Sequence, residues 1–177
     1  AFPEEFGGNG MGYLAQVLIV EEIARHSIEA AFTFNSQAMS VPLGIYNWGT
    51  EEQARNYVPR LLKGEYVGCF SLTEPDCGSD AAAIKTRAVR DGDEYIINGT
   101  KMWATYGNVA DVILLFVKTQ PEMGAKGATA LAIEPKGLKG FSSHKIPSNI
   151  GTNCAPSCEL SFDNCRVPAS WMINKEG

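Results

Sequence analysis

The sequence has no apolar run that approaches the length of a membrane span, and it has few basic residues. A membrane-spanning helix needs about 20 consecutive apolar residues, whereas the apolar segment at 112–117 has only the length of a strand. Lys and Arg number 15 against 20 Asp and Glu, which gives a net charge of −5. Because phosphate binding needs a positive face, nucleic acid is not expected as the main partner.

Metal-binding patterns and targeting segments are missing as well. The five cysteines include no Cys-x-x-Cys, and the histidines, His26 and His144, lie far from any such pair. We therefore expect no metal site, and free thiols in a reducing compartment. The N-terminus lacks a starting Met and both the charged and the apolar parts of a signal peptide, so we expect the chain to begin within a longer protein.

The residues that are present predict helices in the first third of the chain. With 45% apolar residues, the 177-residue chain has the composition of a globular protein of one domain or two small ones. Apolar spacings of three and four residues predict a helix over 11–31 and a second helical stretch near 37–46. A third helix is predicted from Thr50, which forms a capping box with Gln53, to Gly64.

After Gly64 the apolar period changes to two, which predicts strands. Asp91-Gly92-Asp93 predicts a hairpin turn, and Asn98-Gly99 predicts another turn. Helices followed by strands predict an α+β fold of two domains, with the boundary near residues 64–67. The strands are expected at 66–73, 84–89, 94–97, 100–105, 111–119, 128–134, 141–146 and 158–162.

One nucleotide-binding motif is set aside. Residues 10–15 match G-x-G-x-x-A, a form of the dinucleotide fingerprint. That fingerprint needs a strand before it and a βαβ unit around it. Here a proline-containing segment precedes the motif and a helix follows, so we interpret it as a glycine-rich loop ahead of a helix.

Two segments carry residues suited to binding a polar ring and a phosphate. In the first, residues 70–80, a strand ends at Thr73 and a turn with several hydroxyls and backbone N–H groups follows. In the second, residues 98–108, strand alternation places Trp103 and Thr105 on one face, where they could cover a conjugated ring and bond its edge. An ordinary strand-to-turn junction and a core tryptophan are the structural alternatives for these two segments.

Together these segments resemble the acyl-CoA dehydrogenase family. The resemblance covers essentially the whole chain in the family's order, with further matches at residues 3–8 and 21–25. Its motifs are Leu72-Thr73-Glu74-Pro75-x-x-Gly78-Ser79-Asp80, Gly92-Asp93-x-Tyr95-x-x-Asn98-Gly99-x-Lys101-x-Trp103-x-Thr105 and Phe162-x-x-Cys165-x-Val167-Pro168.

The resemblance implies both a domain plan and a cofactor. Residues 1–66 would be the C-terminal part of the family's N-terminal helical domain, and residues 67–177 an antiparallel, β-barrel-like middle domain. FAD would bind between this middle domain and a C-terminal helical domain outside this chain. Trp103 would lie against the flavin, Thr105 would bond near its N5 atom, and Ser79 would also contact the acyl-CoA thioester arm. The implied FAD-binding residues are Phe70, Leu72, Thr73, Gly78, Ser79, Trp103, Ala104 and Thr105.

The reaction implied by the resemblance is α,β-dehydrogenation of an acyl-CoA thioester. A glutamate takes the α-proton while the β-hydrogen leaves as hydride to flavin N5. No acid here occupies the position of that base, so we expect the glutamate in the C-terminal domain, no catalytic residue in this chain, and no activity of the chain alone. The role of Glu74 is expected to be structural.

The resemblance also implies partners and a location. Electrons would pass to an electron-transferring flavoprotein or a similar acceptor. The full-length protein would be a homotetramer or homodimer, in the cytoplasm of a bacterium or the mitochondrial matrix of a eukaryote. Two alternatives stay open: an oxygen-using relative, either an acyl-CoA oxidase or a flavin monooxygenase of the same fold, and a catalytically inactive remnant that binds flavin or substrate.

Departures from the family pattern bear on the substrate. Members that take dicarboxyl substrates carry an arginine where this chain has Ala31, and Phe32, Phe34 and Met39 lie nearby in sequence. We therefore expect an uncharged acyl tail. Asn153 stands where the family commonly has arginine, which puts a CoA or domain-packing contact from that loop in doubt.

Overall fold

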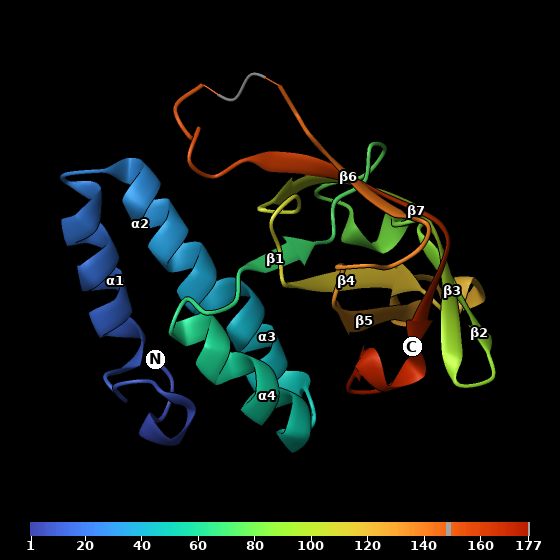
Figure 1. Ribbon diagram of the computed structural model, residues 1–177, viewed down its shortest axis with the longest axis horizontal. Coiled ribbons are helices and arrows are strands. Elements are labelled where there is room, and N and C mark those ends of the chain that lie inside the picture. Colours follow the sequence, from blue (N-terminus) through green and yellow to red (C-terminus); the bar gives the residue numbers. More distant parts are fainter. Residues whose placement is uncertain (148–149, 177) are drawn as a thin grey trace.

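Helices come first along the chain and strands second, as the change of sequence period predicts. The computed structural model describes residues 1–147 and 150–176, and Figure 1 shows the helices gathered on one side and the strands on the other. The α-helices are α1 (Gly12–Ala24), α2 (Ile28–Asn35), α3 (Val41–Trp48) and α4 (Glu51–Leu62). The strands are β1 (Gly68–Ser71), β2 (Arg87–Asp91), β3 (Glu94–Thr105), β4 (Val112–Lys118), β5 (Ala128–Ile133), β6 (Phe141–Lys145), β7 (Ser157–Pro168) and β8 (Met172–Ile173).

The helix predicted over 11–31 is two helices, α1 and α2. Ser27 has an extended backbone, with φ −155°, and its hydroxyl accepts a hydrogen bond from the Ala30 N–H at 3.2 Å. A serine in this arrangement begins a new helix. The predicted second helical stretch is also composite, because a π-helical segment, Ser36–Ser40, joins α2 to α3.

Helix α4 begins as its capping box predicts. The Thr50 hydroxyl accepts from the Gln53 N–H at 3.1 Å, and the Gln53 side chain accepts from the Thr50 N–H at 2.9 Å. The Gln53 amide also donates to the Met172 carbonyl at 3.0 Å, which ties the helix start to β8. One face of α4 is buried, through Ala54, Tyr57, Val58 and Leu61.

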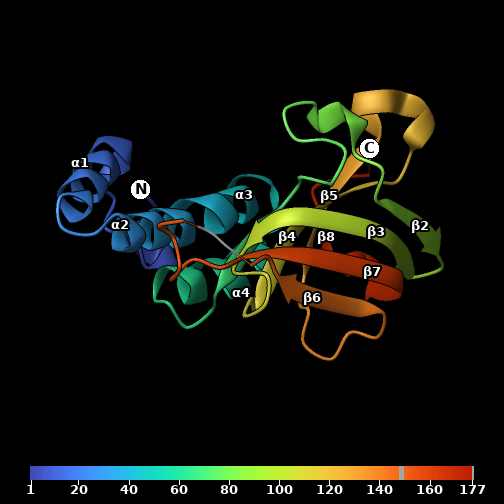
Figure 2. The same cartoon turned by 90° about the horizontal axis from the view of Figure 1, so that it is seen from above.

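The strands form a mostly antiparallel sheet in the order β6-β7-β3-β2-β4-β5-β8, with β1 paired to β4 outside that path. Figure 2 shows this sheet from above, with the helices beside it. Two pairings are parallel, β1 with β4 and β2 with β4, so the antiparallel expectation holds for most of the sheet rather than all of it. The Asp91–Glu94 hairpin is present as predicted.

Asn98-Gly99 is not a turn, contrary to the prediction. Strand β3 continues through it, with a shift in its register against β7 between Ile97 and Gly99. Gly99 has φ +147°, and a Cβ atom there would lie 2.6 Å from the Thr86 hydroxyl oxygen. Gly99 therefore allows the backbone of β3 to lie close to Thr86. Besides forming turns, glycine is commonly used in strands for such close contacts.

The core has two parts, which meet at β4. Alternate residues of this strand face opposite ways: Ile113 and Leu115 belong to the sheet interior, while Val112 and Leu114 belong to the layer between sheet and helices. Burial on both faces explains why this strand is apolar without interruption. Within the described residues, no helix is both long and apolar enough to cross a membrane.

Candidate functional site

The turn after β1 is held by its own backbone. The Glu74 N–H donates to the Cys77 carbonyl at 3.0 Å, and the Cys77 N–H donates back to the Glu74 carbonyl at 3.2 Å. Leu72 and Thr73 lie between the strand and this turn and are half-buried. The turn therefore holds a fixed shape beside the sheet.

A buried ion pair joins this turn to β3. The Lys101 ammonium is fully buried and lies 2.8 Å from a Glu74 carboxylate oxygen, and it also donates to the Leu72 carbonyl at 2.9 Å. Burial by itself would raise the pKa of Glu74, but hydrogen bonds from Lys101, Thr86 and Lys85 outweigh it and hold that pKa below its usual range. Burial lowers the pKa of Lys101, and the pair with Glu74 partly offsets this. Glu74 is thus a carboxylate with its counterion in place.

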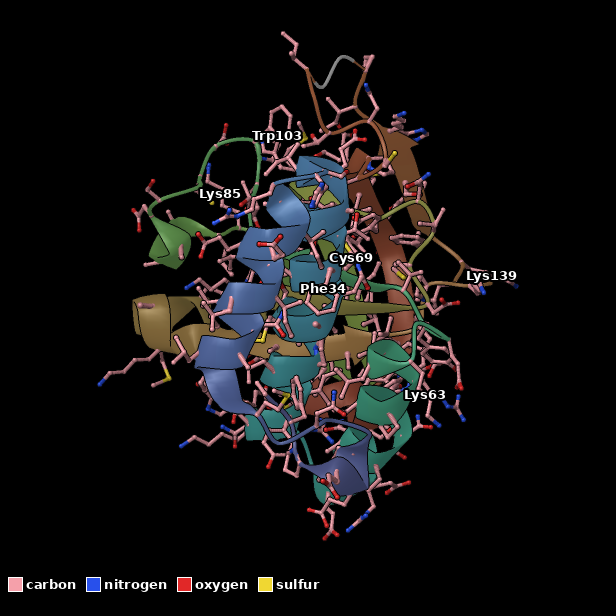
Figure 3. All side chains as sticks on the ribbon, turned by 90° about the vertical axis from the view of Figure 1, so that its left-hand side faces the viewer. Phe34, Lys63, Cys69, Lys85, Trp103 and Lys139 are labelled. Carbon is pink, nitrogen blue, oxygen red and sulfur yellow. The ribbon has the colours of Figure 1, made fainter. Side chains whose placement is uncertain are left out.

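Strand β3 bulges directly after Lys101. Its register against β7 shifts between Lys101 and Ala104, and Trp103 has φ +58°, in the left-handed region that non-glycine residues seldom adopt. The Met102 N–H donates to the Thr73 carbonyl at 2.8 Å. The bulge leaves the Trp103 side chain 56% exposed, and Figure 3 shows it projecting from the ribbon.

Trp103 and Thr105 line one groove, as strand alternation predicts, although Trp103 itself lies within the bulge that follows Lys101. The groove has a volume of about 390 Å³ and runs between the helices and the sheet. Phe70 of β1 forms part of the same wall and is 42% exposed. The residues that line the groove carry no charge, and they are Phe32, Asn35, Ser36, Ser40, Phe70, Trp103 and Thr105.

The other predicted cofactor-binding residues lie outside this lining. Gly78 and Ser79 are exposed on the turn that follows β1, and Leu72 and Thr73 are half-buried at its start. The Ala104 side chain is buried in the sheet core, so it contributes no side chain to the groove. The structure thus brings together Phe70, Trp103 and Thr105, and it places the rest on the adjoining turn or behind the wall.

A larger apolar groove lies next to the first and shares Phe70 and Ser40 with it. Its volume is about 600 Å³, and its walls are α3 and strands β4 and β5. The rings of Phe70 and Phe116 are 5.2 Å apart between their centroids. Met39 and Trp48 line this second groove. Sequence spacing did not indicate it, because its residues come from segments far apart in the chain.

The residues near Ala31 separate in the structure. Phe32 lines the first groove and Met39 the second, while Phe34 lies in a small cavity beside α1. Ala31 itself is buried. Asn35, which lines the first groove, was not singled out from the sequence, and only its spacing of three residues from Phe32 in α2 could have indicated it.

The described residues contain no group of three or more His, Cys, Asp or Glu side chains placed to hold a metal ion. All five cysteines are free. Two family models account for nearly the whole chain: the acyl-CoA dehydrogenase N-terminal domain matches residues 1–65, and the acyl-CoA dehydrogenase middle domain matches residues 69–165. The chain belongs to the acyl-CoA dehydrogenase family.

Individual relatives agree with this assignment. Acryloyl-CoA reductase (NADH) of Anaerotignum propionicum is 43% identical over 99% of this chain and 44% of its own length. A solved glutaryl-coenzyme A dehydrogenase in complex with glutaryl-CoA matches with a TM-score of 0.94 and 35% identity, over 99% of this chain and 45% of that one. A chain in a structure described as the electron transferring flavoprotein of Acidaminococcus fermentans matches with a TM-score of 0.91 and 39% identity, over 99% of this chain and 46% of that one.

The matches thus cover nearly all of this chain but only part of each relative. The chain spans less than half the length of each of these three proteins. The resemblance and the fold class inferred from sequence are confirmed by these matches. The domain bounds and the roles of the individual site residues stay predictions.

Proposed function

We propose that the full-length protein containing this chain is an FAD-dependent enzyme that removes the α and β hydrogens of an acyl-CoA thioester. One observation carries the proposal: Phe70, Trp103 and Thr105, from two separate strands, meet in one uncharged groove in a chain of this family. Large exposed aromatic side chains at a groove are typical of a ligand-binding site. A flat ring with a polar edge fits an indole face beside a hydroxyl.

In this proposal, the residues of this chain bind and orient FAD and the acyl-CoA thioester. When bound, FAD supplies the hydride acceptor. Trp103 would cover the flavin ring, and the Thr105 hydroxyl would donate a hydrogen bond near N5. Ser79 and the backbone N–H groups of its turn would bind polar atoms of the cofactor and of the thioester arm. A glutamate outside this chain would take the α-proton.

The proposal also covers the electron acceptor, the oligomeric state and the location of the protein in the cell. The electron acceptor would be an electron-transferring flavoprotein or a similar carrier, and a chain in a structure described by that name is among the similar structures. The full-length protein would assemble as a homodimer or homotetramer, in the bacterial cytoplasm or the mitochondrial matrix. Among the described residues that line the groove there is no Lys, Arg or His, which supports an uncharged acyl tail over a dicarboxyl one.

A second candidate is the same chemistry run in reverse, as reduction of an α,β-unsaturated acyl-CoA. It is supported by the name of a relative that is 43% identical, acryloyl-CoA reductase. The groove residues would serve both directions, because each direction passes through the same transition state.

The test is anaerobic mixing of the purified full-length protein with butyryl-CoA and, separately, glutaryl-CoA. Dehydrogenation predicts loss of the oxidised flavin absorbance, with butyryl-CoA at least a hundredfold more effective, since a buried unpaired carboxylate costs several kcal/mol. The chain 1–177 alone, supplied with FAD, should show no loss. Bound FAD with no response to any acyl-CoA would contradict the proposal and support the inactive remnant. Rapid oxygen uptake during turnover would support the oxidase or monooxygenase alternative. Reoxidation of reduced protein by crotonyl-CoA, together with no loss of flavin absorbance on mixing with butyryl-CoA, would support the reverse reaction.

Two substitutions in that protein test the roles of the groove residues. Thr105→Val keeps the volume and removes the hydroxyl, so flavin reduction should slow about fivefold, the effect of one net hydrogen bond of about 1 kcal/mol. Trp103→Ala should instead lower the amount of FAD retained per chain, because it removes a large contact surface. If both variants only lower the melting temperature, and the flavin spectrum and reduction rate are unchanged, the two residues are structural.

A further inference from the structure

Lys101 and Glu74, the buried ion pair, form several hydrogen bonds with other protein groups. Besides Lys101, the Glu74 carboxylate accepts from the backbone N–H of Lys85 at 2.6 Å and from that of Thr86 at 2.9 Å. The Lys101 ammonium donates to Glu74 and to the Leu72 carbonyl. Neither residue lines the groove. A direct contact with a ligand therefore does not explain the pair.

The pair joins the two segments that carry the predicted flavin-binding residues, β3 and the turn after β1. Lys101 stands two residues before Trp103, at the start of the register shift in β3. Its bond to the Leu72 carbonyl, and the neighbouring bond from the Met102 N–H to the Thr73 carbonyl, attach β3 to the segment between Phe70 and Ser79. These contacts fix two segments that are far apart in sequence relative to each other.

The backbone of Trp103 needs such support. A left-handed conformation is unfavourable for a bulky residue and persists only where its surroundings impose it. A change of Trp103 to an ordinary strand conformation would alter the direction in which its side chain leaves β3. The residues on either side of it are held: Lys101 and Met102 by the turn, and Ala104 by its pairing with Cys158.

Stability alone is a weak reason for such a pair. Two apolar side chains of similar volume often stabilise a core as much as a buried ion pair, because ions lose their hydration on burial. The ion pair also fixes geometry, because the Lys101 ammonium donates hydrogen bonds to two particular oxygen atoms, the Leu72 carbonyl and a Glu74 carboxylate oxygen. Apolar packing would not define that geometry.

We infer that Lys101 and Glu74 are positioning residues: through the β3 bulge they hold Trp103 and Thr105 facing the groove, in register with the turn at Leu72 and Thr73. The inference rests on the proposed function, because only a chain that binds FAD would use the β3 bulge as a wall of the FAD site.

The test uses the full-length protein and three variants: Glu74→Gln, Lys101→Met and the double variant that combines them. The single variants leave one buried group without its partner and are expected to lose stability. The double variant contains no unpaired charge, so it should lose less stability than either single variant. It still lacks the bond to Leu72, and the amide at position 74 can accept from only one of the N–H groups of Lys85 and Thr86. Its dissociation constant for FAD, measured by flavin fluorescence, should rise about tenfold, the effect of one charged hydrogen bond. The visible absorption band of its bound flavin should also shift.

Tyr57→Phe is the matched control. The Tyr57 hydroxyl donates to Glu134 at 2.8 Å between α4 and the end of β5, and neither residue lines the groove. This variant should lose stability with no change in FAD affinity or in the flavin spectrum. A double variant that binds FAD with wild-type affinity and spectrum would overturn the positioning role. If wild-type protein binds no FAD, the proposed function fails and takes this inference with it. If a single variant does not fold, the double variant carries the test.

Discussion

Helices α1 and α4 are similar in length, with 13 and 12 residues, and differ in what covers them. Helix α4 buries four apolar side chains in the layer between helices and sheet, whereas Gln16 is the only residue of α1 that is buried. Leu14, Val17 and Leu18 of α1 are all more than half exposed. The sequence predicted helical structure in both places, from apolar spacing for α1 and from the capping box for α4, but it did not predict this difference. An apolar face becomes core only when another element covers it, and an exposed one indicates a contact surface.

The largest expected effect comes from replacing one leucine in each helix by alanine. Leu61→Ala in α4 should lower the free energy of unfolding by about 3 kcal/mol, because Leu61 is 2% exposed and its removal leaves a cavity. Leu14→Ala in α1 should change it by less than about 0.5 kcal/mol, since Leu14 is 73% exposed. Urea unfolding of the two variants measures both values. Equal losses would mean that α1 is covered in solution.

A smaller loss of stability is expected from replacing Asp111, whose carboxylate binds the segment between α4 and β1. Asp111 accepts from the Val67 N–H at 2.8 Å and pairs with Lys136 at 2.7 Å. Burial alone would raise the pKa of Asp111, but these bonds outweigh it and hold that pKa below its usual range. The resulting stability is complete above the unfolded-state pKa and is lost as the pH falls through the folded-state pKa.

Asp111→Asn should therefore cost about 2 kcal/mol at pH 7, the size of one charged hydrogen bond, and less at acid pH. Urea midpoints between pH 7 and pH 3 measure the difference from wild type. Asp91→Asn is the control, because Asp91 pairs with Arg166 at an exposed position and should have little effect. A constant difference across the pH range would contradict the assigned pKa shift.

The smallest effect on unfolding, and a clear effect on association, is expected from charges placed on α1. Chain 1–177 should associate with itself through exposed apolar faces, of which α1 carries one. Leu14→Glu with Leu18→Lys should reduce the apparent mass in light scattering towards that of a monomer, with unfolding changed by less than about 0.5 kcal/mol. A wild-type chain that is already a clean monomer at high concentration would contradict this interpretation of the exposed face.

Part of the candidate site could be predicted from sequence because it follows from local geometry. Strand alternation placed Trp103 and Thr105 on one side, and the residues after Thr73 predicted the turn at Glu74–Cys77, although β1 ends at Ser71, two residues earlier than predicted. The Lys101–Glu74 pair could not be predicted in the same way, because 27 residues separate its members and spacing gives no information on contacts at that distance. The reading of Asn98-Gly99 as a turn was wrong for a related reason: a glycine needed for close backbone approach looks the same in sequence as one needed for a turn.

The sequence by itself determined those features whose cause lies within a few residues. The capping box at Thr50, the hairpin at Gly92 and the period change after Gly64 all result from local hydrogen bonding or side-chain alternation. The family resemblance also belongs here, because its motifs can be read directly from the chain.

Only the tertiary structure decided the features that depend on distant partners. The left-handed Trp103, the counterion of Lys101, the burial of both faces of β4 and the exposure of α1 each require knowledge of what lies opposite. The physical reason is that burial and charge pairing are properties of surroundings, and a sequence states the residues without stating their neighbours in space.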